Sequence, residues 1–144
     1  MASVAHLFRA PKRRILMEEV ESVEAIEDHG FAGCTHAKKG GQRQVLLVDK
    51  ETLAAMDLVP GVIRENITTE GLNVNGLAPG EQLHVGSVLL QVSAVCTPCD
   101  QLELVRPGLR REIYGRRGML CRVLKGGILR RGDPIRREVA AAGA

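Results

Sequence analysis

The chain has 144 residues, 44% of them hydrophobic, which suffices for one sizeable core but not for two comfortable domains. No apolar run approaches the roughly 20 residues that cross a bilayer, and the N-terminus lacks an apolar segment followed by a small-residue cleavage site. We therefore expect a cytoplasmic protein without membrane contact. The net charge of +3 is unevenly spread, because residues 1–100 carry 9 Lys and Arg against 13 Asp and Glu, whereas residues 101–144 carry 11 against 4.

Arginines in the basic last third come in pairs: Arg110-Arg111, Arg116-Arg117, Arg130-Arg131 and Arg136-Arg137. Guanidinium groups bind phosphate bidentately, so an anionic cofactor or partner is one interpretation. The other is a solvated, solubilising face, because neighbouring residues on a strand point to opposite sides and cannot both line one pocket. Aromatic residues make up 2% of the chain, with no Trp, which leaves little for nucleic-acid bases to stack on and disfavours nucleic-acid binding.

The first 26 residues give a weak structural signal. We expect residues 1–14 to form a flexible N-terminal arm. Residues 15–26 are ambiguous, because Leu16, Val20, Val23 and Ile26 have near-helical spacing, whereas alternate residues from Val20 to Ile26 would share one face of a strand.

The next segments have clearer patterns. Residues 29–43, rich in Gly, His and Lys, follow no period and indicate a loop. Residues 44–48 are predicted to form a short buried strand. Asp49 can then N-cap a helix over residues 50–56, with apolar spacing at Leu53 and Met56.

The second half contains regularly spaced breakers. Alternating apolar residues predict a β-hairpin from Leu83 to Val95, with its turn at Gly86-Ser87. One or two helical turns are expected over residues 100–105, strands over 119–124 and 135–139, and a disordered tail over 140–144. Many short strands joined by Gly-rich turns favour a mainly β barrel over alternating βαβ units.

Four cysteines, Cys34, Cys96, Cys99 and Cys121, are expected to be free or chemically active thiols, because the chain is large enough to fold without disulfides. Pro98 withholds its N–H from a sheet, which places Cys99 at the end of a strand. The Cys96-x-x-Cys99 spacing leaves three alternatives open: half of a zinc site, a redox dithiol, or one functional cysteine beside a spare one. An exposed thiol near basic residues is stabilised as thiolate, so Cys99 is the predicted reactive thiol, although a buried, inert cysteine is the alternative.

Several motifs occur together in a fixed order: Gly33-Cys34-Thr35-His36, Arg43-Gln44-Val45, Pro60-Gly61 through Glu65-Asn66 to Leu72, Thr97-Pro98-Cys99, Gly126-Gly127 and Gly132-Asp133. Over about residues 18–139 the chain resembles the MOSC family, the C-terminal domain of molybdenum cofactor sulfurases that also occurs as small stand-alone bacterial proteins. The resemblance implies a single domain over residues 15–139, folded as a compact distorted β-barrel like that of pyruvate kinase, with one or two short helices. It also favours strand for residues 15–26.

The resemblance further implies the site. Cys99 matches the family's Pro-Cys cysteine and is the predicted catalytic residue, with direct molybdenum ligation as an extension. The predicted cofactor-binding residues are His36, Arg43, Glu65, Asn66 and Arg117. Glu65 and Asn66 have two open roles, either binding a heterocycle edge or holding a turn through side-chain to backbone hydrogen bonds. The sequence departs from the family at Cys34, which stands where the family has an acidic residue.

Functionally, the resemblance implies a stand-alone protein that binds a molybdenum cofactor (molybdopterin) or carries sulfur on Cys99. Such a protein is either a molybdenum-dependent oxidoreductase that reduces N-hydroxylated bases, or a non-catalytic module that delivers cofactor or sulfur to a partner enzyme. A sulfurase or an electron-donor protein is the implied partner. The family is also associated with pyridoxal phosphate, but 144 residues hold only the MOSC part, so no pyridoxal phosphate is expected on this chain alone.

Overall fold

A computed structural model describes residues 2–12 and 17–138. The strands are β1 (Ser3–Arg9), β2 (Glu18–Val20), β3 (Ser22–Ile26), β4 (Gly30–Phe31), β5 (Val45–Asp49), β6 (Ile67–Glu70), β7 (Gln82–Val85), β8 (Val88–Val95), β9 (Met119–Lys125), β10 (Gly127–Arg130) and β11 (Ile135–Arg137). The helices are all short: α1 (Lys50–Ala55), η1 (Val74–Gly76), α2 (Leu102–Val105) and α3 (Leu109–Glu112). In the described part of the chain, no helix has the length and apolar character needed to span a membrane.

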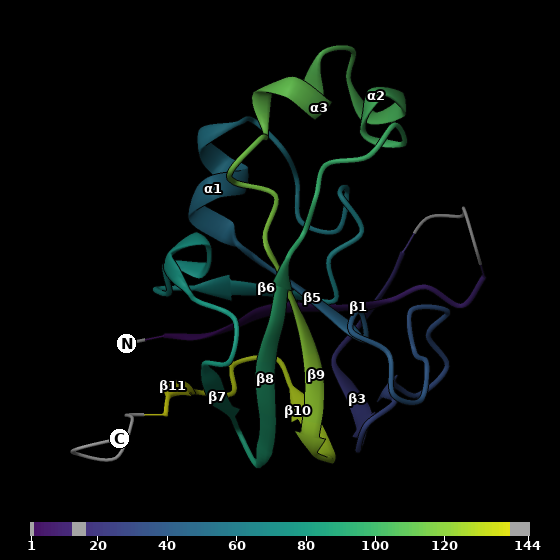
Figure 1. Ribbon diagram of the computed structural model, residues 1–144, viewed down its shortest axis with the longest axis vertical. Coiled ribbons are helices and arrows are strands. Elements are labelled where there is room, and N and C mark those ends of the chain that lie inside the picture. The colour runs from purple at the N-terminus through teal and green to yellow at the C-terminus, as the bar shows by residue number, and fades with distance from the viewer. Residues whose placement is uncertain (1, 13–16, 139–144) are drawn as a thin grey trace.

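Most of the strands form one mixed sheet in the order β11-β7-β8-β9-β5-β6-β1-β2, and β10-β3-β4 form a second, smaller sheet. All pairings are antiparallel except that between β5 and β6. In Figure 1 the long strands β8 and β9 run along the middle of the molecule, and α1, α2 and α3 gather at one end of it.

The large sheet curls back on itself without closing into a barrel. Its edge strands are β11 and β2. The start of β1 nevertheless reaches the segment before β11, where Val4 N–H donates to Asp133 O (2.9 Å) and Ile135 N–H donates to Ala2 O (2.9 Å). The predicted mainly β class with a distorted β architecture is confirmed, although the sheet is not a closed barrel and, in the described residues, three short α-helices with one 3₁₀ turn stand where one or two helices were expected.

β5 is buried on both faces, and this divides the core in two. Val45 and Leu47 face the interior of the curled sheet. Leu46 and Val48 face the opposite way, toward side chains of the helical layer, among them Leu53 of α1, Leu102 of α2 and Leu109 of α3. Successive residues of a strand point to opposite faces, so the four successive apolar residues of β5 support both cores at once. The second core anchors the helices at the end of the sheet where the pockets lie.

Several local predictions are confirmed. The expected hairpin is β7–β8, with Gly86 at φ +57° in its turn, where a side chain would collide with Asp133. Asp49 N-caps α1, because its Oδ2 accepts the Thr52 N–H at 3.0 Å. Residues 18–26 form β2 and β3 rather than a helix, while residues 15 and 16 and the expected tail 140–144 lie outside the described residues.

The expectation of a loose N-terminal arm is not met over residues 3–9, which form β1. β1 pairs with both β2 and β6, and it buries Val4, Leu7 and Phe8. Burial of these apolar side chains and hydrogen bonding on both sides hold the segment in the sheet. β6 and β10, for which we predicted no strands, are also short elements whose partners lie far away in the sequence.

Candidate functional site

A tight loop between Pro60 and Asn66 shapes one side of the candidate site. Buried Glu65 holds it, because its Oε2 accepts hydrogen bonds from Gly61 N–H (2.9 Å) and Thr68 Oγ1 (2.8 Å). Gly61 has φ +86°, and a side chain there would collide with the Phe8 ring. Arg64 also has a left-handed backbone (φ +68°), which costs a non-glycine residue roughly 1–2 kcal/mol. The loop is therefore held in a strained conformation that presents the Arg64 side chain.

A pocket of about 810 Å³ lies between this loop and α2. Its apolar wall includes Val62, Leu104 and Val105, and its polar groups include Arg64, Arg117 and the thiol-bearing residue Cys99. The volume falls within the range of small-molecule sites, as does the combination of an apolar lining with a few polar groups. Cys99 is exposed, so its thiol is available at the pocket.

Arg117 is the unusual member of this pocket, because it is a cation that is only 6% exposed. Its Nη2 donates to Ile63 O at 2.9 Å, whereas Nε and Nη1 are buried and lack hydrogen-bond partners among the described residues. Glu65 Oε1 is likewise buried, with no hydrogen-bond partner in the part of the chain that the structure describes. Buried unpaired donors on a charged group are costly, so this guanidinium is suited to an anion or to water.

The other arginines of the basic third are mostly engaged. Ion pairs join Arg106 to Glu112, Arg110 to Asp100, Arg122 to Asp28, Arg131 to Glu19 and Glu21, and Arg137 to Glu81. These pairs lie at the surface and support the interpretation of a solvated face for this part of the charge. The pair Arg116-Arg117 splits as expected of neighbours, with Arg116 exposed and Arg117 buried.

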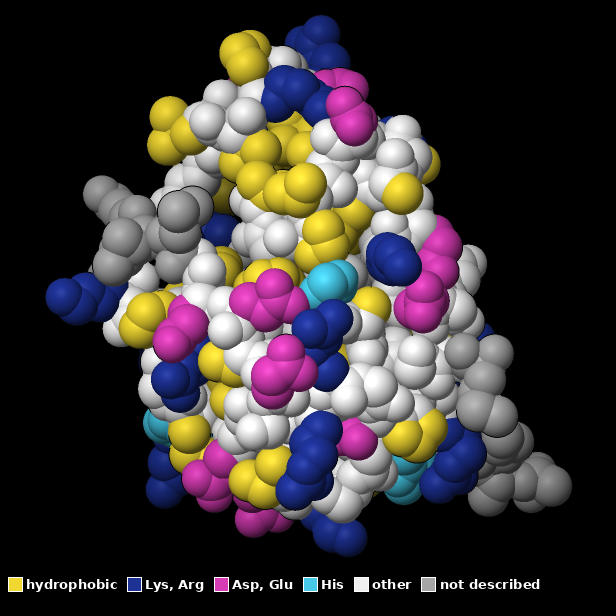
Figure 2. Space-filling model, turned by 180° about the vertical axis from the view of Figure 1, so that it is seen from behind, with side chains coloured by type: hydrophobic (Ala, Val, Ile, Leu, Met, Phe, Trp, Pro, Cys, Tyr) yellow, Lys and Arg dark blue, Asp and Glu magenta, His cyan; other side chains and the backbone are white. Residues whose placement is uncertain are grey.

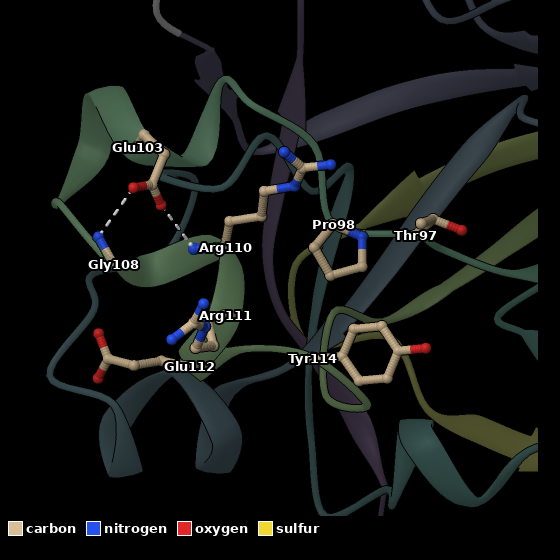
Figure 3. A pocket seen from close by; sticks show the side chains of 8 residues that line it. All are labelled: Thr97, Pro98, Glu103, Gly108, Arg110, Arg111, Glu112 and Tyr114. Carbon is tan, nitrogen blue, oxygen red and sulfur yellow. Dashed lines mark hydrogen bonds between the residues drawn. The ribbon is translucent and has the colours of Figure 1, made fainter.

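A second pocket, of about 680 Å³, lies between Pro98 and the α2–α3 turn (Figure 3). Its main carboxylate is already satisfied, because Glu103 accepts the backbone N–H groups of Gly108 and Arg110, both at 3.0 Å. These bonds lower the pKa of Glu103. Tyr114, 77% exposed, lies across from Pro98. This pocket offers no buried unpaired polar group comparable to those of Arg117 in the described residues.

Exposed apolar side chains accompany the helical end of the molecule. Leu104 is 88% exposed, and Val59 and Val95 are also exposed. Figure 2 shows hydrophobic side chains gathered over the upper half of one face, the end at which α2 and α3 lie in Figure 1, with mixed charges below them.

Three polar side chains meet where the loop that follows β4, which carries Cys34 and His36, contacts Asn66 just before β6. Asn66, fully buried at the start of β6, donates from Nδ2 to Cys34 Sγ (3.4 Å) and contacts His36 Nδ1 through Oδ1 (3.1 Å). The Cys34 thiol also accepts the backbone N–H of Ala10 (3.3 Å), and the His36 side chain acts on it as a hydrogen-bond partner that lowers its pKa. Cys34, His36 and Asn66 thus form one hydrogen-bonded cluster, which we call the thiol cluster.

The two titratable members of the thiol cluster, Cys34 and His36, shift each other's pKa. Burial raises the pKa of Cys34, but hydrogen bonds from His36 and from two backbone N–H groups outweigh it, and the pKa falls to about 7. The hydrogen bond to Cys34 raises the pKa of His36 above its ordinary value, although burial and the charge of Arg64 oppose this. By contrast, burial alone raises the pKa of Cys121, which is fully buried in β9.

The comparisons with known proteins agree with this fold. The model of the MOSC domain matches residues 10–136. The chain belongs to the MOSC family. No curated protein matches it at a significant level.

Similar solved structures share the fold at low sequence identity. The YuaD protein from Bacillus subtilis is 20% identical, with 94% of each chain covered and a TM-score of 0.76. YiiM from Geobacillus stearothermophilus is 21% identical over 100% of this chain and 78% of that one, with a TM-score of 0.80. YiiM from Escherichia coli is 18% identical over 98% and 71%, with a TM-score of 0.74.

Within the MOSC domain, the predicted site residues divide into two groups. Cys99 and Arg117 line the larger pocket, while His36 and Asn66 belong to the thiol cluster. Arg43 is exposed in the loop before β5 and lines neither pocket. The roles of all these residues toward a cofactor stay predictions.

Sequence reasoning did not select as site residues two residues of the MOSC domain, one that lines the larger pocket and one that belongs to the thiol cluster. Arg64 lines the pocket and acts electrostatically on His36, so it links the two groups. Cys34 is expected from the sequence to be a free or chemically active thiol and departs from the family pattern, and its position two residues before His36 is the signal that could have selected it. Glu65 and Asn66 both bond to backbone groups, the second of their two expected roles.

Proposed function

We propose that this MOSC-domain protein binds an anionic cofactor of the molybdopterin type in the pocket between the 61–64 loop and α2. The observation that carries the proposal is the buried Arg117 guanidinium, whose Nε and Nη1 lack partners among the described residues. A phosphate or another anionic group of a ligand would supply the missing acceptors. Membership of the MOSC family supports the molybdenum cofactor as the ligand.

The residues present fit such a cofactor. Arg117 and Arg64 provide two cationic groups for the phosphate, and Val62, Leu104 and Val105 provide an apolar wall for a flat heterocycle. Cys99 adds an exposed soft thiol of the kind that binds metals as thiolate. When bound, the cofactor supplies the redox chemistry of molybdenum, whereas the chain binds, orients and partly shields it.

The exposure of Cys99 favours the second candidate function, delivery of cofactor or sulfur to a partner enzyme. A carrier thiol must be accessible to another protein. Exposed apolar Leu104 lies on the same pocket wall and gives such a partner a contact. Reduction of an N-hydroxylated base by the pure, cofactor-loaded protein with an electron donor would favour the enzyme, and transfer to an apo partner enzyme without such turnover would favour the carrier.

Cofactor binding itself is tested on protein isolated from a host that makes molybdopterin. Metal analysis and the fluorescence of the oxidised pterin should give close to one molybdenum and one pterin per chain. Arg117→Met should abolish both, whereas Arg116→Met, at the exposed neighbour, should retain both. Arg117→Lys keeps the positive charge but replaces the guanidinium that donates to Ile63 O. Pterin retained in this variant would attribute the loss in Arg117→Met to the missing charge and not to the missing hydrogen bond.

Wild-type protein without pterin, or full pterin content in a folded Arg117→Met variant, would refute the proposed site. Circular dichroism and thermal melting of each variant establish that it is folded before its pterin content is compared.

A further inference from the structure

The Cys34 sulfur is surrounded by hydrogen-bond donors. Ala10 N–H lies 3.3 Å from Sγ, Asn66 Nδ2 lies 3.4 Å from it, and the His36 side chain, two residues along the chain, lowers the pKa of the thiol as a hydrogen-bond partner. A thiol can donate only one proton and accepts weakly, whereas a thiolate accepts several hydrogen bonds. Three donors around one sulfur therefore favour the thiolate, which is the nucleophilic form.

The backbone fixes the orientation of the Asn66 amide. Leu46 N–H donates to Oδ1 at 2.9 Å, and Phe8 C=O accepts from Nδ2 at 3.3 Å. A backbone N–H can only donate and a backbone carbonyl can only accept, so Nδ2 must be the atom that faces the sulfur. The donor to Cys34 is thus set by the fold.

Asn66 also orients His36. Its Oδ1 can only accept, so the proton of this 3.1 Å contact must lie on His36 Nδ1. A nucleophile, a histidine hydrogen-bonded to it, and a third group that holds the histidine are the three parts of an activated thiol, as in cysteine proteases with Cys, His and Asn.

The surroundings of Cys34 limit what can react there. The residue is 8% exposed, packs with the core inside the curled sheet, and lies between exposed Gly33 and Thr35. Arg64 acts on His36, and the guanidinium of Arg9 lies beside Gly33, where it is paired with Glu18 (2.9 Å). A thiol with so little exposed surface favours a small reagent over a protein or a bulky disulfide.

We propose that Cys34, His36 and Asn66 form a nucleophilic thiol site, separate from Cys99, whose substrate is a small molecule with a weak O–O or S–S bond. The three residues of this site are present whether or not the pocket binds a cofactor.

The reaction balances without a further reagent. The Cys34 thiolate bonds to one atom of the weak bond, the bond breaks, and the leaving atom takes the electron pair and then a proton from the His36 imidazolium. A hydroperoxide is reduced to water or an alcohol, and Cys34 is oxidised to the sulfenic acid. A small persulfide transfers its outer sulfur, which leaves a persulfide on Cys34 and releases the parent thiol.

The first test measures alkylation of each cysteine in the full chain with limiting iodoacetamide, followed by peptide mapping, from pH 5.5 to 9.5. Cys34 should react with a midpoint near its pKa of about 7, and Cys96 and Cys121, which are buried, should stay unmodified. In His36→Gln the Cys34 midpoint should rise toward the ordinary value of about 8.5, which lowers the rate at pH 7 by about fifteenfold. His29→Gln, at a histidine outside the cluster in the turn between β3 and β4, should leave the rate unchanged.

The second test distinguishes the two substrates in a Cys99→Ser background. Hydrogen peroxide with dimedone present should label Cys34 if the substrate is a peroxide, and sodium disulfide should add one sulfur atom to Cys34 if it is a persulfide. Reaction in either arm supports the site and names its substrate. The proposal is overturned if both arms fail, or if Cys34 in the wild type is alkylated with the pH midpoint of an ordinary thiol. The second of these measurements uses the wild-type protein and so does not depend on the folding of any variant.

Discussion

Replacing Asn66 with alanine should both destabilise the protein and change the reactivity of Cys34. The side chain is fully buried and makes four polar contacts, of which the bond from Leu46 N–H, at 2.9 Å, is the shortest. Leaving one buried N–H unpaired costs about 1–3 kcal/mol. The weaker bond to Phe8 O and the lost packing add to this, so we expect a loss of about 2–4 kcal/mol in the free energy of unfolding.

Urea denaturation measures this loss. With a denaturant dependence of about 2 kcal/mol per molar urea, typical of a small domain, the midpoint should fall by about 1–2 M. Asn73→Ala is the matched control, because Asn73 is exposed and makes no capping hydrogen bond at η1, and it should change the free energy by less than about 0.5 kcal/mol. Equal effects of the two substitutions would refute the buried-network argument.

Asn66→Asp separates the two roles of the residue. A carboxylate still accepts from Leu46 N–H and His36, but when ionised it cannot donate to Phe8 O or to Cys34. Its negative charge also opposes the thiolate. Cys34 in this variant should therefore be alkylated more slowly at pH 7 than in the wild type, even where the variant remains folded. An unchanged alkylation rate would show that the Asn66 donor does not stabilise the thiolate.

Three further predictions follow from the fold. Val92→Asp places an unpaired charge at a position that is 1% exposed and should unfold the protein. Gln91→Asp, on the other face of β8, should be tolerated. Similar melting temperatures of the two variants would contradict the assignment of faces. Asp49→Ala removes the N-cap of α1 and should cost about 0.5–2 kcal/mol by urea denaturation. Burial raises the pKa of Glu65 above its ordinary 4.5, although Gly61 N–H, Thr68 and Arg117 oppose the shift. The stability that Glu65 contributes is therefore complete below pH 4.5 and is lost as the pH rises through its folded-state pKa. Glu65→Gln should flatten this part of the pH–stability profile, and an unaltered profile would assign the pH dependence to other groups.

Local patterns sufficed where an element is stabilised by its own sequence neighbours. The β7–β8 hairpin alternates buried and less buried residues on both sides of Gly86, and α1 has a capping aspartate followed by apolar residues at helical spacing. β1 carries no such signal, because its burial depends on pairing with β6, some sixty residues later. Its Leu7 and Phe8 are adjacent and both buried, a pattern that departs from the alternation of a half-buried strand.

The candidate site shows the same limit. The close spacing of Cys96 and Cys99 drew attention to them as a pair, yet Cys96 is packed in the helical core and Cys99 is exposed. Both cysteines follow the end of β8 at Val95, and Pro98 lies between them. Cys34 and Asn66 are 32 positions apart, and only the meeting of the loop after β4 with the start of β6 brings them together. Spacing in sequence could not reveal that contact.

Arg64 connects the pocket to the thiol cluster through charge. Its guanidinium lowers the pKa of His36, in opposition to the hydrogen bond from Cys34, and the same side chain lines the larger pocket. An anion that binds beside Arg64 offsets part of this positive charge, and so favours the imidazolium form of His36 and with it the Cys34 thiolate. Coupling between two sites is reciprocal, so the thiolate–imidazolium pair must in turn alter the affinity of the pocket for that anion by the same factor. The left-handed backbone at Arg64, held by buried Glu65, is thus what places one cation between the two sites.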